Sequence, residues 1–380
     1  MRDTIDRILM HDVRVSAKTR WLFLTLQAKS GLVGLGEASL QGREVLVKQA
    51  GDRFAPSLLG APAEPADMTG RCGTLAEAAF VSAADQALHD IAARREGKRL
   101  ADHLGARRQR VPLYANVNRR TVDRSPAGFA ASAGLALDAG FTAFKLAPFD
   151  EVDDAARREG RFIEAMRPGL DRIAAVAGAI GPRRELMVDC HWRFDEASAT
   201  TLIEEVARLG VRWLECPVAE TGAAIPAIRR LRRLANDAGM RLAGCEELIG
   251  VEQNRPFAEA GVYDVMMPDV KYAGGVSEMM RLATLFEGLG VAYSPHNPAG
   301  PIAHAASLHI SAAVRHFDRL EVQFEESDLF WRLTGGSLPR FEDGHSLLPE
   351  GPGLGIMLDP DLLASVSDRV GDWSLARAVP

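Results

Sequence analysis

Polar residues close a series of short apolar runs in the second and third thirds of the chain. They are Lys145, Asp189, Glu215, Glu246, Asp269, His296 and Glu321. From Asp189 onward they are separated by 26, 31, 23, 27 and 25 residues, each the length of one strand and one helix. In a parallel barrel the ends of successive strands are neighbours on one rim, so we expect these side chains to converge on one mouth.

Three of these residues are carboxylates that close consecutive runs, namely Asp189, Glu215 and Glu246. Buried side by side, they would repel one another strongly unless they were paired or bound a cation. Ligation by carboxylate and water oxygens favours Mg²⁺ over Zn²⁺. The pattern therefore predicts a Mg²⁺ site, and three unrelated rim acids in salt bridges are the alternative.

Strand geometry predicts which neighbouring side chains share this rim. Because side chains alternate across a strand, Asp189 and His191 should face inward and Cys190 should face the outer helices. Cys216 and Cys245 also adjoin proposed ligands and should likewise face outward. This phase argues against a thiolate metal site.

Eight apolar runs, with helix-length intervals behind most of them, predict the scaffold that positions these residues. The runs span residues 111–117, 142–149, 185–192, 211–218, 241–248, 263–270, 291–297 and 319–324. Eight strands in this rhythm favour a TIM-type α/β barrel over an open doubly wound sheet. The segment after the first run, ANVNRRT, also lacks the glycines of a dinucleotide site.

The first hundred residues predict a different unit. Residues 20–28 and 32–38 form an expected β-hairpin around a turn at 29–31, and Thr74 opens an expected helix with capping-box spacing. We place this small α+β domain at residues 1–110 and the barrel at 111–345. The Gly/Pro-rich segment 346–380 is expected to pack back on the first domain.

Composition excludes several classes of protein. The 380 residues carry 45 Lys+Arg against 51 Asp+Glu without a basic tract, so we expect no nucleic-acid partner. No apolar run is long enough to span a membrane, and the start lacks the apolar core of a secretory signal. Four cysteines without a CxxC pair predict no disulfide framework and a cytoplasmic location.

The motifs around the polar residues resemble the mandelate racemase and muconate lactonizing branch of the enolase superfamily. The likeness covers nearly the whole chain and rests on VDCHWRFD, WLECP, AGCEEL, MPDVKYAGGVSE, SPHNPAGPIAHAASLH and PGLG. It implies an α/β fold in which an N-terminal α+β capping domain, completed by the C-terminal segment, accompanies a modified (β/α)₇β TIM barrel.

The resemblance also implies roles for the polar residues. Mg²⁺ would be held by Asp189, Glu215 and Glu246, with Glu247 as the competing third ligand. Asp269 and His296 would form an acid/base dyad. Glu321 resembles the rim group that hydrogen-bonds the substrate carboxylate.

Two departures bear on the reaction. The racemase pattern Lys-x-Lys is reduced here to Lys145 followed by Ala147, which disfavours a racemase that uses the second lysine as a base. Lys145 itself is expected to contact the substrate carboxylate or tune a neighbour. Asp189-Cys190-His191 is similar to the Asp-x-His pattern of galactonate and mannonate dehydratases, in which that histidine does acid/base work.

These features predict a Mg²⁺-dependent sugar-acid dehydratase that yields a 2-keto-3-deoxy acid. We assign His191 as the base at C2 and His296 as the acid for the 3-hydroxyl, and the two roles are exchangeable. A racemase, epimerase or cycloisomerase with His191 as the opposite-face base is the alternative.

Substrate contacts are expected from the capping loops at 14–21 and 39–45 and from the strand ends. The candidates are Arg20, Arg43, Asn116, Asn118 and Arg193. The substrate is an aldonate or an aldarate, and segment 150–168 reads as an insertion near the mouth. By the resemblance we also expect a homo-oligomer.

Overall fold

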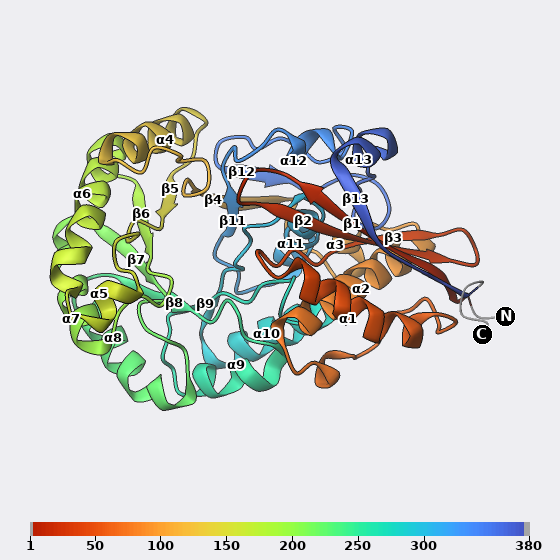
Figure 1. Cartoon of the computed structure of the whole chain (residues 1–380), viewed down its shortest axis with the longest axis horizontal. Helices are drawn as coiled ribbons and strands as arrows, with labels where there is room; N and C mark the ends of the chain where they lie inside the picture. The colour runs from red at the N-terminus through yellow and green to blue at the C-terminus, as the bar shows by residue number, and fades with distance from the viewer. Residues whose placement is uncertain (1–2, 376–380) are drawn as a thin grey trace.

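Two sheets organise the chain (Figure 1). In this computed structural model, which describes residues 3–375, the smaller sheet is antiparallel and has the order β13-β1-β2-β3. Its strands are β1 (Ile5–Arg14), β2 (Arg20–Ala28), β3 (Val33–Glu37) and β13 (Ser367–Ser374). The hairpin expected at residues 20–38 is confirmed as β2 and β3, whereas β1 and its pairing with β13 were not anticipated.

Two helices pack on this sheet. They are α1 (Glu44–Leu58) and α2 (Leu75–Arg95). The capping box is confirmed, because the Thr74 side chain accepts a hydrogen bond from the Glu77 backbone and the Glu77 side chain accepts one in return. Gly34 and Gly36 let β3 approach α2 closely, since a Cβ at Gly36 would lie 1.9 Å from the carbonyl oxygen of Ala83.

The larger sheet has nine strands, of which eight are parallel and form a ring, and the ninth, β12 (His345–Leu347), is antiparallel. In chain order the parallel strands are β4 (Arg110–Asn116), β5 (Ala143–Leu146), β6 (Glu185–Asp189), β7 (Val211–Glu215), β8 (Arg241–Gly244), β9 (Val265–Met266), β10 (Ala292–Tyr293) and β11 (Leu320–Gln323). Neighbours in the chain pair in parallel, β11 pairs with β4, and a bridge between Tyr293 and Phe317 closes the ring. Each of the eight expected runs overlaps one strand, and the α/β barrel is confirmed.

Helices surround the ring. The longer ones are α4 (Pro126–Asp138), α6 (Phe162–Ile180), α7 (Glu196–Arg208), α8 (Ile225–Asp237), α9 (Gly250–Glu259), α10 (Gly275–Leu289) and α11 (Pro301–Ala313). The shorter elements are η1 (Thr69–Arg71), α3 (Leu100–His103), α5 (Asp154–Arg158), η2 (Gly222–Ala224), α12 (Leu329–Arg332), β12 (His345–Leu347) and α13 (Pro360–Val366). Inside the ring, Tyr114, Met187, Trp213 and Met267 form a packed apolar plug, so the barrel is a core and not a pore.

The antiparallel sheet lies beside the barrel, opposite α4, α6 and α7 (Figure 1). Glu37 at the end of β3 joins the two parts, because its carboxylate accepts hydrogen bonds from the backbone of Gly300 and Ala303 at the start of α11. The assignment of domains at residues 1–110 and 111–345 stays a prediction. Within residues 3–375, no helix has the length and apolar character needed to cross a bilayer.

Candidate active site

A cavity of about 1010 Å³ opens at the carboxyl ends of the barrel strands. Barrel residues in its wall include Asp189, His191, Glu246, His296 and Glu321. Loops of the antiparallel sheet complete it with Ser16, Ala17, Lys18, Thr19, Leu40, Gln41 and Arg43. The two loops expected to close over the mouth therefore both reach the cavity.

Asp189 and Glu246 line this cavity, and Glu215 lies beside them. Each offers one oxygen, and these three oxygens all lie within 4.8 Å of one another. All three residues are buried, whereas Glu247 is exposed and lies outside the cluster. Of the two glutamates predicted as alternative third ligands, Glu246 therefore lies with the other two carboxylates and Glu247 does not.

The electrostatics of this triad fit a cation. Glu246 Oε2 is buried and accepts no hydrogen bond from any described residue. Burial, together with the charges of Asp189 and Glu215, raises the pKa of Glu246 well above its usual range. Burial also raises the pKa of Glu215 to about 7, although Lys145 opposes the shift. Crowded carboxylates with an unsatisfied oxygen are a donor set suited to Mg²⁺.

His191 reaches the cavity by a different route from the one the sequence predicted. Strand β6 ends at Asp189, and His191 has a left-handed backbone with φ of 46°. Strand alternation therefore does not place it. Instead, its backbone N–H donates to Asp189 Oδ1, and its Nε2 lies 2.8 Å from Asp189 Oδ2. The Asp189 charge raises the pKa of His191, against the effect of burial.

His296 belongs to a buried chain of polar groups. Its Nδ1 lies 2.8 Å from Asp269 Oδ2, and its Nε2 lies 3.7 Å from Glu246 Oε2. The same Asp269 oxygen accepts a hydrogen bond of 2.6 Å from Lys271 Nζ. Burial raises the pKa of Asp269, but Lys271 and His296 outweigh it and the net direction is downward. Lys271 was not selected from the sequence, although a lysine between apolar residues, two positions after Asp269, could have indicated it.

Lys145 lies behind the cavity wall. Its Nζ donates to Glu215 Oε1 at 2.6 Å and lies 3.0 Å from Glu321 Oε1. Asn116 donates to the same Glu321 oxygen at 2.7 Å. Lys145 is only 1% exposed and does not line the cavity.

The predicted substrate contacts divide into two groups. Arg43, Asn116 and Asn118 line the cavity. Arg20 and Arg193 do not line it. Arg20 is held on the sheet surface by the carboxylate of Asp12, with a shortest contact of 2.6 Å, because the neighbouring strand offers an ion pair there. Arg193 donates to the carbonyl oxygen of Val152.

The loop after β4 supplies three arginines that the sequence analysis did not select. Arg119, Arg120 and Arg124 all line the cavity. Each is paired with a carboxylate of another loop: Arg119 with Glu326, Arg120 with Glu325 and Arg124 with Asp150. Asp150 is also the residue of segment 150–168 that reaches the cavity, while the rest of the segment forms α5 and the first turns of α6.

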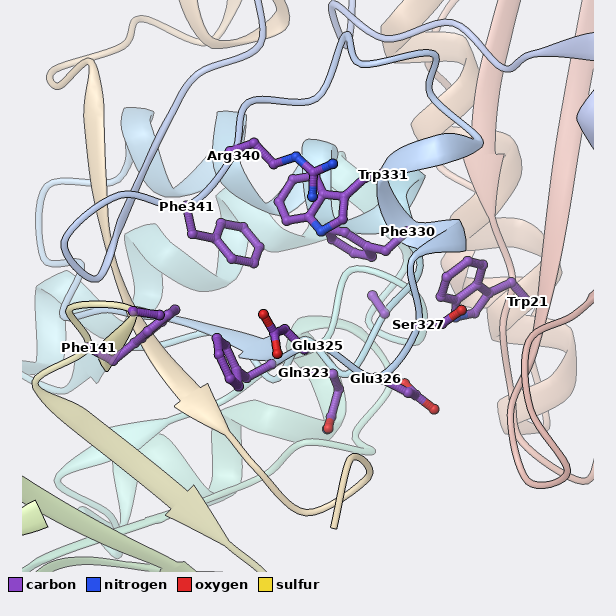
Figure 2. Close-up of a pocket in the computed structure, with 13 residues that line it drawn as sticks. Trp21, Phe141, Gln323, Glu325, Glu326, Ser327, Phe330, Trp331, Arg340 and Phe341 are labelled. Carbon is purple, nitrogen blue, oxygen red and sulfur yellow. The ribbon is translucent and has the colours of Figure 1, made fainter. Parts of the chain in front are cut away.

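A smaller pocket adjoins the cavity (Figure 2). It measures about 140 Å³, and Gln323, Glu325 and Glu326 line both spaces. Its other walls are mainly aromatic, formed by Trp21, Phe141, Phe324, Phe330, Trp331 and Phe341. Figure 2 shows the labelled aromatic rings on both sides of the strand end that carries Gln323, with Phe141 on one side and Trp21 on the other. The segment from residue 323 to 327 thus separates an aromatic pocket from the polar cavity.

Comparison with known proteins gives concordant matches. Residues 128–362 match the family described as enolase C-terminal domain-like, and residues 8–105 match the mandelate racemase / muconate lactonizing enzyme, N-terminal domain. A protein named D-galactonate dehydratase from Verminephrobacter eiseniae is 30% identical over 383 residues, covering 93% of each chain. A protein of the same name from Variovorax paradoxus is 28% identical over 391 residues, covering 96% of this chain and 95% of the relative.

Solved structures agree on the fold. A member of the enolase superfamily from Salmonella Typhimurium superposes with a TM-score of 0.84 at 22% identity, covering 98% of this chain and 100% of the other. A mandelate racemase/muconate lactonizing enzyme from Jannaschia sp. CCS1 superposes with a TM-score of 0.83 at 22% identity, covering 96% and 98%. At this identity the superpositions speak for the architecture alone.

Proposed function

The chain belongs to the mandelate racemase and muconate lactonizing branch of the enolase superfamily, and from this premise we propose that it is a Mg²⁺-dependent sugar-acid dehydratase. One observation carries the proposal: His191 and His296, from different strand ends, border the same cavity as the buried carboxylate triad. The relatives named D-galactonate dehydratase support hydro-lyase chemistry.

The carboxylate triad supplies the metal half of this proposal. Asp189, Glu215 and Glu246 would hold the ion, which stabilises the negative charge that develops on the substrate carboxylate when the neighbouring carbon loses its proton. Lys145 favours the charged forms of Glu215 and Glu321 and fixes their positions, because it contacts both while buried.

The two histidines supply the proton transfers. His191 removes the proton from C2, and the C3–O bond breaks as His296 gives a proton to the departing hydroxyl, which leaves as water. The resulting enol takes up a proton at C3 and becomes a 2-keto-3-deoxy acid. Asp269 holds Nδ1 of His296, so that Nε2 is the atom available to the cavity. The overall balance is unchanged if the two histidines exchange roles.

The pairing of the charged side chains that line the cavity supports an aldonate, with one carboxylate, over an aldarate, with two, as the substrate. The three arginines of the loop after β4 are already neutralised by Glu325, Glu326 and Asp150. Hydroxyl-bearing carbons would meet polar neutral groups such as Asn118 and Gln41. Lys18 and Arg43 form no ion pair with a described residue, so a second carboxylate would have to bind near these two side chains at the rim.

An epimerase is the second candidate, because the same two histidines could serve opposite faces of one carbon. Ala147 excludes only the lysine base of the racemase pattern. This candidate predicts exchange of the C2 proton with solvent and no loss of water.

The test is a panel of aldonates and aldarates, including galactonate, incubated with the protein and Mg²⁺ and assayed for 2-keto acid. We expect turnover of at least one aldonate, abolished by EDTA and by His191→Asn, and unaffected by His316→Asn at an exposed histidine outside the cavity. Deuterium uptake at C2 in D₂O without 2-keto acid would favour the epimerase. Full turnover by His191→Asn would overturn the assignment of that residue.

A further inference from the structure

A carboxylate behind the metal triad makes contacts with three strand ends at once. Glu220 lies in the turn that follows β7. Its Oε2 accepts a hydrogen bond of 3.0 Å from Trp192 Nε1, beyond β6. Its Oε1 accepts one of 2.6 Å from the backbone N–H of Cys245, beyond β8, and lies 3.9 Å from Cys216 Sγ, beyond β7. These are the ends that carry Asp189, Glu215 and Glu246.

The residues that Glu220 contacts have an unfavourable backbone. Trp192, Cys216 and Cys245 have φ values of 55°, 46° and 69°, in the left-handed region that residues with a Cβ disfavour. Such a conformation persists only where the surrounding structure holds it. Cys216 directly follows Glu215 and Cys245 directly precedes Glu246, so each turn sets the direction of a proposed ligand.

The fold makes room for this carboxylate. A Cβ at Gly244, the last residue of β8, would lie 2.3 Å from Glu220 Oε1 and 2.6 Å from Tyr263 Cζ. Tyr263 also donates its hydroxyl to the same oxygen at 2.7 Å. No described cation forms an ion pair with Glu220. Its two carboxyl oxygens instead accept hydrogen bonds from N–H and O–H donors, which requires an acceptor at both oxygens.

We propose that Glu220 is a positioning residue that holds the three ligand-bearing turns in register, so that Asp189, Glu215 and Glu246 converge on one cation. This role rests on the proposed function, in which those carboxylates bind Mg²⁺. Glu220 acts through Trp192, Cys216 and Cys245 and does not touch the ion. Groups that orient metal ligands commonly contribute 10- to 100-fold in affinity.

The test is the Mg²⁺ affinity of Glu220→Gln, measured by titration calorimetry on the full chain. The side-chain amide of glutamine puts an N–H₂ group where a Glu220 oxygen accepts a hydrogen bond, so that hydrogen bond is lost. We therefore expect the Kd for Mg²⁺ to rise about 10- to 100-fold. Asp90→Asn is the matched control. Asp90 is also a buried carboxylate, accepting from the backbone of Leu35 and Leu354, but it lies in α2, away from the triad. Its Mg²⁺ affinity should stay within about threefold of the wild type.

Trp192→Phe provides a second variant if Glu220→Gln does not fold. It removes the donor to Oε2 and keeps a smaller aromatic ring at this position, so a Kd raised severalfold at an unchanged melting temperature supports the role. Wild-type affinity in a folded Glu220→Gln protein, or an equal loss in Asp90→Asn, would overturn it. If the wild-type protein binds no Mg²⁺, the proposed function fails as well; if only the variants are unaffected, this role alone fails.

Discussion

At the scale of single residues, two basic side chains contact one carboxylate oxygen of Asp269. Lys271 and His296 contact the same oxygen, and all of Lys271 except about 1% of its surface is buried. A buried ammonium is stable only beside a charge of opposite sign, so Lys271 keeps Asp269 ionised and fixed in orientation. The position of the His296 ring therefore depends on a residue that does not border the cavity.

Lys271→Met tests this dependence. We expect kcat to fall about 10- to 100-fold with little change in KM, since His296 loses its fixed partner while the cavity wall is unchanged. Lys271→Arg should recover part of the loss, and Lys98→Met, at an exposed lysine, should have no effect. An unchanged kcat in Lys271→Met, measured with the substrate found in the panel, would rule out this dependence.

The adjacent pair Glu246 and Glu247 allows a direct test of the proposed ligand set. Glu246→Gln should weaken Mg²⁺ binding by at least about 100-fold, because it removes a charged ligand from the centre of the triad. Glu247→Gln should change the Kd by less than about threefold, since Glu247 is exposed and outside the cluster. Calorimetric titration of both variants decides between the two glutamates, and a larger effect at Glu247 would reverse the assignment.

At the scale of elements, the contact between β3 and α2 depends on glycine. Alternate residues of β3, Gly34 and Gly36, face the backbone of α2, and a Cβ at Gly34 would lie 2.0 Å from the carbonyl oxygen of Ala87. No rotamer relieves a clash with backbone, so the strand and the helix would have to separate. Because Glu37 at the end of the same strand caps α11, such a separation would also disturb the join between the sheet and the barrel.

Gly36→Ala should lower the free energy of unfolding by about 1–3 kcal/mol through this overpacking. Gly178→Ala in α6 is the control, because nothing lies within 4 Å of a Cβ built there, and it should be neutral or stabilising by up to about 1 kcal/mol. Urea denaturation of both variants measures the difference. Equal stabilities would show that β3 can move away from α2 at no cost.

At the scale of the whole molecule, burial keeps several histidines neutral. His309 accepts from the backbone N–H of Ala101 and its Nε2 lies 3.1 Å from the carbonyl oxygen of Leu354, so it links α11 to α3 and to the C-terminal segment. Burial lowers the pKa of His309 to about 4. Below the ordinary pKa of about 6.5, this histidine takes up a proton in the unfolded chain but not in the folded protein. The free energy of unfolding therefore decreases as the pH is lowered.

His309→Gln isolates this effect, since glutamine carries both an acceptor and a donor and does not titrate. The stability of the wild type relative to this variant should be constant above about pH 6.5 and fall by about 1.4 kcal/mol per pH unit from there toward pH 4. The variant is needed as reference because burial raises the pKa of Asp85 to about 7, which makes stability rise as pH falls. Urea midpoints from pH 7.5 to 5 measure the difference, and a gap independent of pH would contradict it.

Much of the fold and the candidate site could be predicted because both depend on local patterns. An apolar run of four to eight residues needs no distant partner to be recognised as a strand, and a polar residue at its end is visible in the same window. Parallel strands then place those ends on one rim, which is why Asp189, Glu215, Glu246 and His296 were found together. The pairing of β1 with β13 was not predicted, because the two strands lie at opposite ends of the chain.

The barrel and the residue types on its rim could thus be read from the amino-acid sequence, since residue type and strand periodicity are properties of short segments. Three contacts became known only from the folded chain: Arg20 pairs with Asp12, Lys271 holds Asp269, and Glu220 reaches three strand ends. These outcomes depend on left-handed turns and on contacts between distant segments. Neither leaves a periodic signal in the sequence, because each is fixed by the packing of the surrounding atoms.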